Sequence, residues 1–297
     1  MPLASASAAC PPAKAVQNPN SVLGKLAGIM IPDPPPFQRF SQPDAFAALL
    51  VCDHASWQIP SRLQKLGLEP GELQRHIGWD IGAFDLAQVL SRELGIGLVA
   101  AGFSRLVIDC NRHLDDPSSI VASSDGTVIP GNQQLPREER RQRARDYFDP
   151  YHLAIEQELQ RLRQRCEAPV LIAIHSFTPV IGGVARPWHC GILWDRDPRI
   201  PVPLLQALGR EKDLVVGDNE PYSGRHPADY TIERHAESQG RAHVCLEIRQ
   251  DQLENEQSVA AWAKRLTVAL RPILSQPALY RASEPYRPER HVKGVIT

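Results

Sequence analysis

The sequence predicts an α/β protein in which a mostly parallel, mixed sheet has helices on both of its faces. Apolar segments of strand length alternate along the chain with longer segments in which apolar residues recur every three or four positions. The strand-length segments are apolar without interruption, as in the run from Val170 to Ile174. Uninterrupted apolar strands are typical of parallel sheets buried on both faces, and the interleaved helices would provide that cover.

The order of the predicted elements follows from these two patterns. Short apolar runs predict strands at residues 47–52, 97–101, 106–108, 170–174, 190–193, 214–216 and 242–248. Helical periodicity predicts helices at residues 83–94, 137–165, 204–210, 230–239 and 259–270. The first of these helices has the clearest pattern, because its apolar residues share one face and Gly95 follows as a stop signal.

Composition sets the domain organisation. The chain has 297 residues, of which 42% are hydrophobic and 23% charged, as is ordinary for a globular protein. Both ends are rich in proline, which disfavours helix and sheet. We therefore expect an N-terminal arm at residues 1–44, a single α/β domain at residues 45–275 and a C-terminal tail at residues 276–297.

Charge and hydropathy exclude several classes of function. The formal net charge is -1 and acidic and basic residues are mixed, so neither nucleic acid nor a membrane is an expected partner. No apolar run approaches the ~20 residues that cross a bilayer. The N-terminus lacks the pattern of a secretory signal, and the six cysteines form no CxxC pair. We expect a cytoplasmic protein whose partner is a small molecule, and its oligomeric state stays open.

Polar residues follow directly where the predicted strands end. They are Asp53-His54, Asp109-Cys110-Asn111-Arg112, His175-Ser176 and Glu247. In a parallel sheet the carboxyl ends of the strands meet at one edge, where α/β proteins bind their ligands. The sequence therefore predicts a single site at this edge.

Two of these residues predict a metal site. His54 and His175 each follow a strand, and a catalytic zinc site combines such imidazoles with a carboxylate and a water. Asp80 is the favoured carboxylate ligand, with Asp53 as its competitor. Asp80 also lies just before the helix at 83–94, so an N-terminal cap is the alternative interpretation.

Glu247 is the candidate general base. It lies in an apolar strand, where a carboxylate needs a partner or takes a raised pKa, and a raised pKa suits a group that exchanges protons at neutral pH. The alternative is an ion pair with Arg249 or another arginine. Arg105 and Arg112, with the amide of Asn111, have the donors that bind a carboxylate or an oxyanion, although surface ion pairs would also account for them.

Several short motifs occur in a fixed order along the core. They are Leu50-Val51-Cys52-Asp53-His54-Ala55-Ser56 with Ile59-Pro60, Asp80, Ser104-Arg105 through Asn111-Arg112, Tyr151-His152, Ile174-His175-Ser176, Asn219-Glu220-Pro221-Tyr222-Ser223-Gly224 and Leu246-Glu247-Ile248. In this order they resemble the N-formylglutamate amidohydrolase family, over about residues 45–270. That family is similar in fold to zinc carboxypeptidases and aspartoacylases, so the resemblance implies a zinc-carboxypeptidase-like fold.

The resemblance also implies roles for individual residues. His175 would be a ligand of Zn²⁺ or another divalent metal, and Glu247 the general base. Arg105 would polarise the scissile carbonyl, and Asn111 with Arg112 would bind the substrate carboxylate. The loop 219–227 would face the substrate through Tyr222, Arg225 or His226, and a plain surface loop is the alternative. The chain departs from the family at Ala55-Ser56, where relatives commonly have Ser-Gly, and it lacks the His-x-x-Glu pair of the carboxypeptidases.

The implied reaction is hydrolysis of N-formyl-L-glutamate to formate and glutamate. Three alternatives stay open at this point. The chain could act on another N-acyl amino acid or a small peptide, or it could be a non-catalytic carboxylate-binding protein. It could also be a cysteine or serine hydrolase, because Cys52 and Cys110 are close in sequence to His54 and Asn111.

Overall fold

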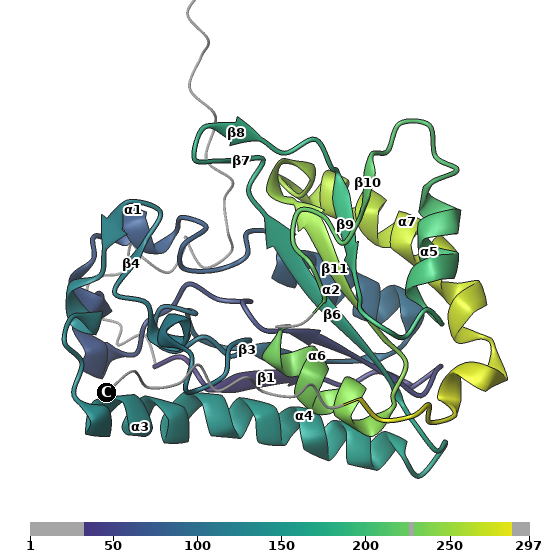
Figure 1. The fold of residues 1–297 in the computed structure, drawn as a ribbon, viewed down its shortest axis with the longest axis horizontal. Coiled ribbons are helices and arrows are strands. Elements are labelled where there is room, and N and C mark those ends of the chain that lie inside the picture. The colour runs from purple at the N-terminus through teal and green to yellow at the C-terminus, as the bar shows by residue number, and fades with distance from the viewer. Residues whose placement is uncertain (1–32, 226–228, 287–297) are drawn as a thin grey trace, which may run out of the picture. The chain divides into compact units, whose positions relative to one another are not determined.

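A computed structural model describes residues 33–225 and 229–286, and these contain a seven-stranded sheet with the order β1-β3-β2-β6-β11-β9-β10 (Figure 1). The strands are β1 Phe37–Phe40, β2 Ala48–Cys52, β3 Gly97–Ala101, β6 Val170–Phe177, β9 Cys190–Leu193, β10 Val216–Asp218 and β11 His243–Arg249. Four neighbouring pairs are parallel, and the pairs β1-β3 and β9-β11 are antiparallel. The predicted mixed, mostly parallel sheet is confirmed.

Helices cover both faces of this sheet, as predicted. One face packs against α2 Ala83–Leu94, α5 Pro201–Leu208 and α7 Glu256–Leu274. The other packs against α4 Asp149–Leu162 and α6 Tyr230–His235. The predicted helix 137–165 is continuous through α3 Arg137–Arg143, a wider turn at Ala144–Phe148 and α4. Smaller elements are α1 Pro70–Leu73 and the pairs β4 Ser123–Ser124 with β5 Thr127–Val128 and β7 Val180–Ile181 with β8 Val184–Ala185.

The two layers explain why the central strands are apolar throughout. Successive side chains of a strand point to opposite faces, so Ile172 enters the core under α2 and α7 while Leu171 enters the core under α4. Each fully buried side chain of this kind stabilises the fold by ~1.5–3 kcal/mol. The end of α2 also follows from sequence, because Gly95 takes the left-handed conformation with φ 68°.

The structure differs from the sequence prediction at the edges. Residues 106–108 form no strand. They lie in a turn in which the Val107 N–H donates to the Ser104 carbonyl, and they are apolar because the turn is buried. Strand β10 begins at Val216, near the end of the predicted strand, and the last helix before β11 shortens to α6 and a separate turn at Glu237–Gln239.

The predicted ends of the domain also differ. Strand β1 lies inside the segment 1–44 that was expected to be an arm, and it pairs with β3 at the edge of the sheet. This strand was not predicted because it directly follows the prolines at 34–36, which disfavour a sheet. At the other end, the turn at Pro277–Tyr280 buries Leu279 in the core, inside the predicted tail. Residues 1–32 and 287–297 lie outside the described part of the chain. Among the described residues, no helix combines the length and the apolar character of a bilayer span.

Candidate active site

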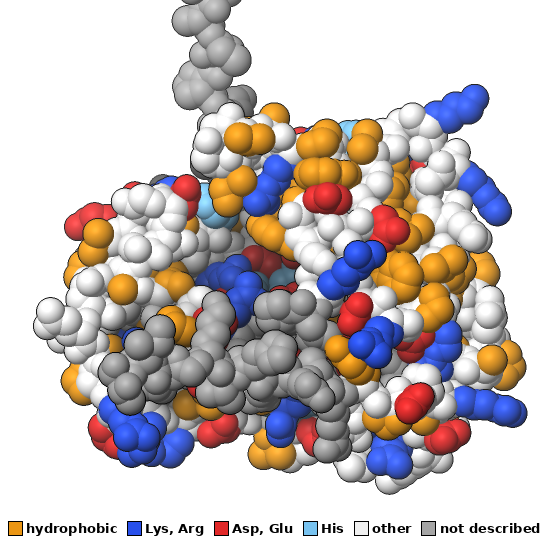
Figure 2. Space-filling view, viewed as in Figure 1, with side chains coloured by type: hydrophobic (Ala, Val, Ile, Leu, Met, Phe, Trp, Pro, Cys, Tyr) orange, Lys and Arg blue, Asp and Glu red, His pale blue; other side chains and the backbone are white. Residues whose placement is uncertain are grey.

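The site lies where β2, β6 and β11 end at the same edge of the sheet. A cavity of about 350 Å³ opens there. Its lining includes Asp80, Arg105, Arg112, Ser176 and Tyr222. Figure 2 shows this face hollowed near its centre, with basic, acidic and histidine side chains gathered in the hollow. The strand-end rule therefore predicted the position of the cavity.

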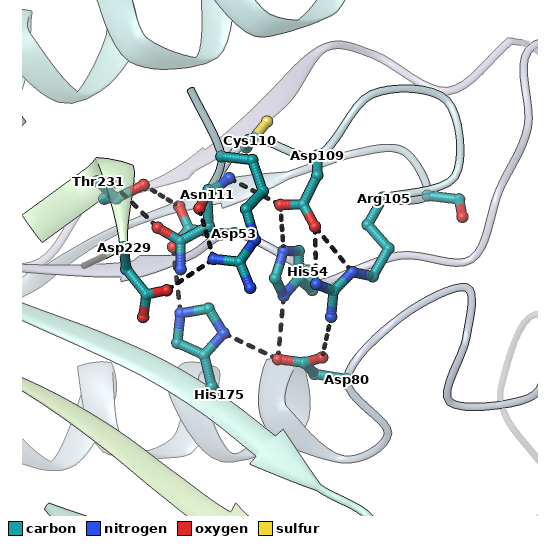
Figure 3. A network of polar contacts seen from close by, with 12 residues as sticks. Asp53, His54, Asp80, Arg105, Asp109, Cys110, Asn111, His175, Asp229 and Thr231 are labelled. Carbon is teal, nitrogen blue, oxygen red and sulfur yellow. Dashed lines mark hydrogen bonds and ion pairs between the residues drawn. The ribbon is translucent and has the colours of Figure 1, made fainter. Parts of the chain in front are cut away.

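His54, Asp80 and His175 converge on one point. One ligand atom from each lies within 4.8 Å of the others, and all three residues are buried. The Nδ1 atom of His54 lies 3.3 Å from Asp80 Oδ2, and that of His175 lies 2.9 Å from the same oxygen (Figure 3). The three residues predicted as metal ligands are thus brought together by β2, β6 and the turn before α2.

Local structure explains how Asp80 reaches the two imidazoles. Its backbone N–H donates to the carbonyl of His54, which ties the turn before α2 to the end of β2. The alternative of a helix cap does not apply, because Gly82 is the N-cap residue of α2 and no side chain caps it. The Asp80 carboxylate is directed to the histidines instead.

The other nitrogen of each imidazole faces a buried aspartate. His54 Nε2 lies 2.8 Å from Asp109 Oδ1, and His175 Nε2 lies 3.2 Å from Asp53 Oδ2. A carboxylate behind a metal-binding histidine fixes its tautomer and orientation, and it leaves the opposite nitrogen for the ion. Both Nδ1 atoms are oriented in this way.

Asp53, the competing ligand in the sequence prediction, has other partners and is not in the converging group. Its Oδ1 accepts hydrogen bonds from the Tyr151 hydroxyl at 2.7 Å and the Thr231 hydroxyl at 2.8 Å, and its Oδ2 faces His175. The contacts of Asp53 and Asp109 with the two imidazoles were not predicted from sequence. The available signal was that each is the first polar residue after a predicted apolar segment.

Electrostatics couple these groups. Burial opposes the charged form of His175, but its hydrogen bonds with Asp53 and Asp80 prevail and raise its pKa well above the usual value. Burial likewise opposes the ionised form of Asp80, whereas His54 and His175 lower its pKa far below the usual range. Two nitrogens and one carboxylate oxygen are a donor set that Zn²⁺ and similar divalent ions accept. The residues present fit such an ion.

Glu247 lies beside this group. It is in register with His175 on the neighbouring parallel strand, so both side chains project from the same face of the sheet. Its Oε2 is buried and has no hydrogen-bond partner among residues 33–225 and 229–286. Burial raises the Glu247 pKa to about 8. The alternative ion pair of Glu247 with an arginine is not found among the described residues, and Arg249 pairs with Asp251 at 2.7 Å.

The two arginines predicted to act on the substrate have acidic partners of their own. Arg105 donates through Nε and Nη2 to Asp109 Oδ2, at 3.0 and 2.7 Å, and its Nη1 lies 3.6 Å from Asp80. Arg112 Nη1 donates to Asp229 at 2.9 Å. Arg105 and Arg112 both line the cavity.

The side chains of Asn111 and Tyr222 differ in their exposure. The buried Asn111 accepts the Thr231 N–H at 3.1 Å through its side-chain oxygen, which ties the Asp109–Arg112 turn to α6. Tyr222 is 43% exposed and accepts a hydrogen bond from Arg186 at 3.0 Å. Arg225 is exposed, and His226 lies outside the described residues.

The two cysteines near the site are poor nucleophiles. Cys52 and Cys110 are buried, and burial raises the pKa of each thiol well above its usual value. A thiol acts as a nucleophile through its thiolate, which needs an electropositive and accessible environment. This geometry disfavours the cysteine-hydrolase alternative.

The fold and the buried His-Asp-His group define an α/β protein with a candidate metal centre at the carboxyl edge of its sheet. The chain belongs to the N-formylglutamate amidohydrolase family, whose model matches residues 46–253. The family recognised from the sequence motifs is thus confirmed.

Individual relatives agree with this placement. The chain is 33% identical to an N-formylglutamate deformylase of Pseudomonas putida over 139 residues, which cover 43% of this chain and 51% of that protein. It therefore spans about half the length of this curated relative. The crystal structure of a gene product from Agrobacterium tumefaciens has a TM-score of 0.76 at 36% identity and covers 80% of this chain and 94% of that one. N-formylglutamate amidohydrolase from Ralstonia eutropha JMP134 has a TM-score of 0.64 at 23% identity, with 80% and 97% covered, and so supports the fold.

Proposed function

We propose that the protein is a metal-dependent amidohydrolase that converts N-formyl-L-glutamate to formate and glutamate. The observation that carries the proposal is the convergence of His54, Asp80 and His175 beside Glu247, in a chain of the N-formylglutamate amidohydrolase family. The P. putida relative has the name of a deformylase for this substrate, which supports the same reaction.

The metal would be held by the Nδ1 atoms of His54 and His175 and the carboxylate of Asp80. A divalent ion supplies a Lewis acid and allows water to lose a proton near neutral pH. The aspartates behind the two imidazoles hold the rings in position and keep their Nδ1 atoms directed at the site. Zn²⁺ is the ion we expect, since its sites commonly combine imidazole nitrogen with carboxylate oxygen.

Glu247 takes the proton of the attacking water and delivers a proton to the leaving nitrogen. Its raised pKa makes it basic enough to accept a proton and acidic enough to return one. Its unpaired Oε2 leaves an acceptor available for that water. A bound divalent cation would lower this pKa again, because positive charge favours the carboxylate.

Two arginines of the cavity bind or stabilise the negative charges of the substrate. Arg105 is held by Asp109 and stabilises the charge that develops on the carbonyl oxygen during attack. Arg112 and the amide nitrogen of Asn111 bind the α-carboxylate, and Tyr222 contacts the substrate from the 219–224 loop. A guanidinium suits this task because its planar donors match a carboxylate.

The test combines metal analysis with formate release. Purified protein is assayed by elemental analysis and on a panel of N-formyl and N-acetyl amino acids, before and after chelation. His54→Ala should lose bound metal and turnover, whereas His189→Gln, an imidazole outside the cavity, should keep both. Full activity in chelator-treated protein, or ligand binding without turnover in metal-loaded protein, would contradict the proposal. Faster hydrolysis of another N-acyl amino acid would make that compound, and not N-formyl-L-glutamate, the substrate.

A further inference from the structure

Arg186 projects from the segment that follows β8 and is held between two aromatic rings. Its guanidinium carbon lies 4.9 Å from the ring centroid of Tyr222 and 5.7 Å from that of Phe177. Its Nη1 donates to the Tyr222 hydroxyl at 3.0 Å. Both aromatic residues line the active-site cavity. Arg186 is therefore fixed at the rim of this cavity by contacts that restrict its conformation.

Its charge is not balanced by an acid in the described part of the chain. The two cavity arginines are paired, Arg105 with Asp109 and Arg112 with Asp229. Arg186 is half-buried, and no ion pair with an aspartate or glutamate is found for it within residues 33–225 and 229–286. Stacking on aromatic rings orders a guanidinium without neutralising it. The remaining donors are suited to an anion that arrives with the ligand.

Arg186 acts electrostatically on His76, which lines the same cavity from the segment after α1. Burial lowers the pKa of His76, and the charge of Asp125 opposes this effect. The charges of Arg75, Arg105 and Arg186 lower the pKa further. The guanidinium of Arg186 is thus close enough to the cavity to act on a group that lines it.

We propose that Arg186 binds the side-chain carboxylate of the substrate and sets the preference for acidic N-acyl amino acids. The inference rests on the proposed function, in which Arg112 and Asn111 bind the α-carboxylate. A dicarboxylate needs a second cationic donor group, and Arg186 lies where the cavity opens beside Tyr222. Charge-assisted hydrogen bonds of this kind discriminate against a neutral isostere, because the isostere leaves the cation unpaired.

The test compares N-formyl-L-glutamate with its neutral isostere N-formyl-L-glutamine. In Arg186→Met the ratio of their kcat/KM values should fall about 10- to 100-fold, mainly through slower hydrolysis of N-formyl-L-glutamate. Arg186→Lys keeps the charge but not the planar fork, so it should retain part of the preference. Arg196→Met is the matched control, because Arg196 also stacks on an aromatic ring, that of Tyr286, outside the active-site cavity. Its ratio should equal that of the unmodified protein.

A binding measurement separates the two proposals. Calorimetry with L-glutamate and L-glutamine reports recognition without turnover, so it remains decisive if the unmodified protein hydrolyses neither formyl substrate. Weaker glutamate binding in Arg186→Met, with glutamine binding kept, supports the role of Arg186. An unchanged ratio, or equal losses for both ligands, overturns it. If the protein shows no turnover but binds glutamate much more tightly than glutamine, the proposed reaction is wrong and the role of Arg186 is unaffected.

Discussion

Replacing Glu247 with glutamine tests the general base through two independent properties. The substitution keeps the shape of the protonated side chain but removes its ability to exchange protons. We expect metal binding to persist, because Glu247 is not among the converging ligand atoms. Turnover should fall by about 10²–10⁴, the usual contribution of a positioned acid-base group. In the absence of metal, the same variant should be more stable than the unmodified protein.

The size of the stability effect follows from the raised pKa. Burial raises the Glu247 pKa from 4.5 to about 8, so between these pH values the folded state keeps a proton that the unfolded state releases. Stability therefore falls as pH rises through this window. At about 1.4 kcal/mol per pH unit, glutamine should stabilise the metal-free protein by about 3.5 kcal/mol near pH 7. For a domain of this size, the midpoint of thermal unfolding would rise by roughly 7–14 °C.

The assay is thermal unfolding of both proteins in chelator at a series of pH values. The two midpoints should coincide below about pH 3.5, where both folded and unfolded Glu247 are largely protonated, and separate steadily up to about pH 8. Formate release and metal content are measured on the same samples. A glutamine variant that is no more stable than the unmodified protein at pH 7.5, or that still turns over substrate at the normal rate, would refute the reasoning.

Three further predictions concern the metal centre and its arginine. Asp109→Asn removes the charge behind His54 and should weaken metal binding about 10- to 100-fold in a chelator competition, whereas the exposed Asp213→Asn should leave it unchanged. Metal affinity should rise with pH by up to about 100-fold per unit, since the raised pKa values of His54 and His175 mean that binding displaces two protons; a flat profile would contradict this assignment. Arg105→Met should lower kcat by about 10²–10³ with a smaller effect on KM, and a change confined to KM would make Arg105 a binding group only.

The core and the position of the site could be predicted because both depend on local patterns. Uninterrupted apolar runs identified the central strands β2, β6 and β11. His54 and His175 were then found as polar residues at the ends of these strands, since parallel strands end at one edge of the sheet. Asp80 was the hardest member of the converging group to predict. It precedes a helix, and only the structure shows that Gly82, and not Asp80, is the N-cap residue.

The remaining features depend on contacts that a single sequence does not contain. The apolar triplet at residues 106–108 has the composition of a strand, but tertiary packing buries it as a turn. Asp109 faces His54 across a separation of 55 positions, and Tyr151 reaches Asp53 from a separation of 98. Arg186 was not selected from sequence, because its significance comes from the two rings beside it. Each of these assignments required the spatial arrangement.

The register between β6 and β11 has a consequence for how this scaffold can diversify. Backbone hydrogen bonding holds His175 opposite Glu247 at the interstrand spacing of about 4.8 Å, whatever the lengths of the surrounding connections. Insertions in the hairpin that precedes Arg186 or in the 219–224 segment can therefore change the shape of the cavity while the backbone spacing between Glu247 and His175 stays constant. Related chains could therefore acquire a different N-acyl amino acid substrate through changes in the loops at the rim of the cavity alone.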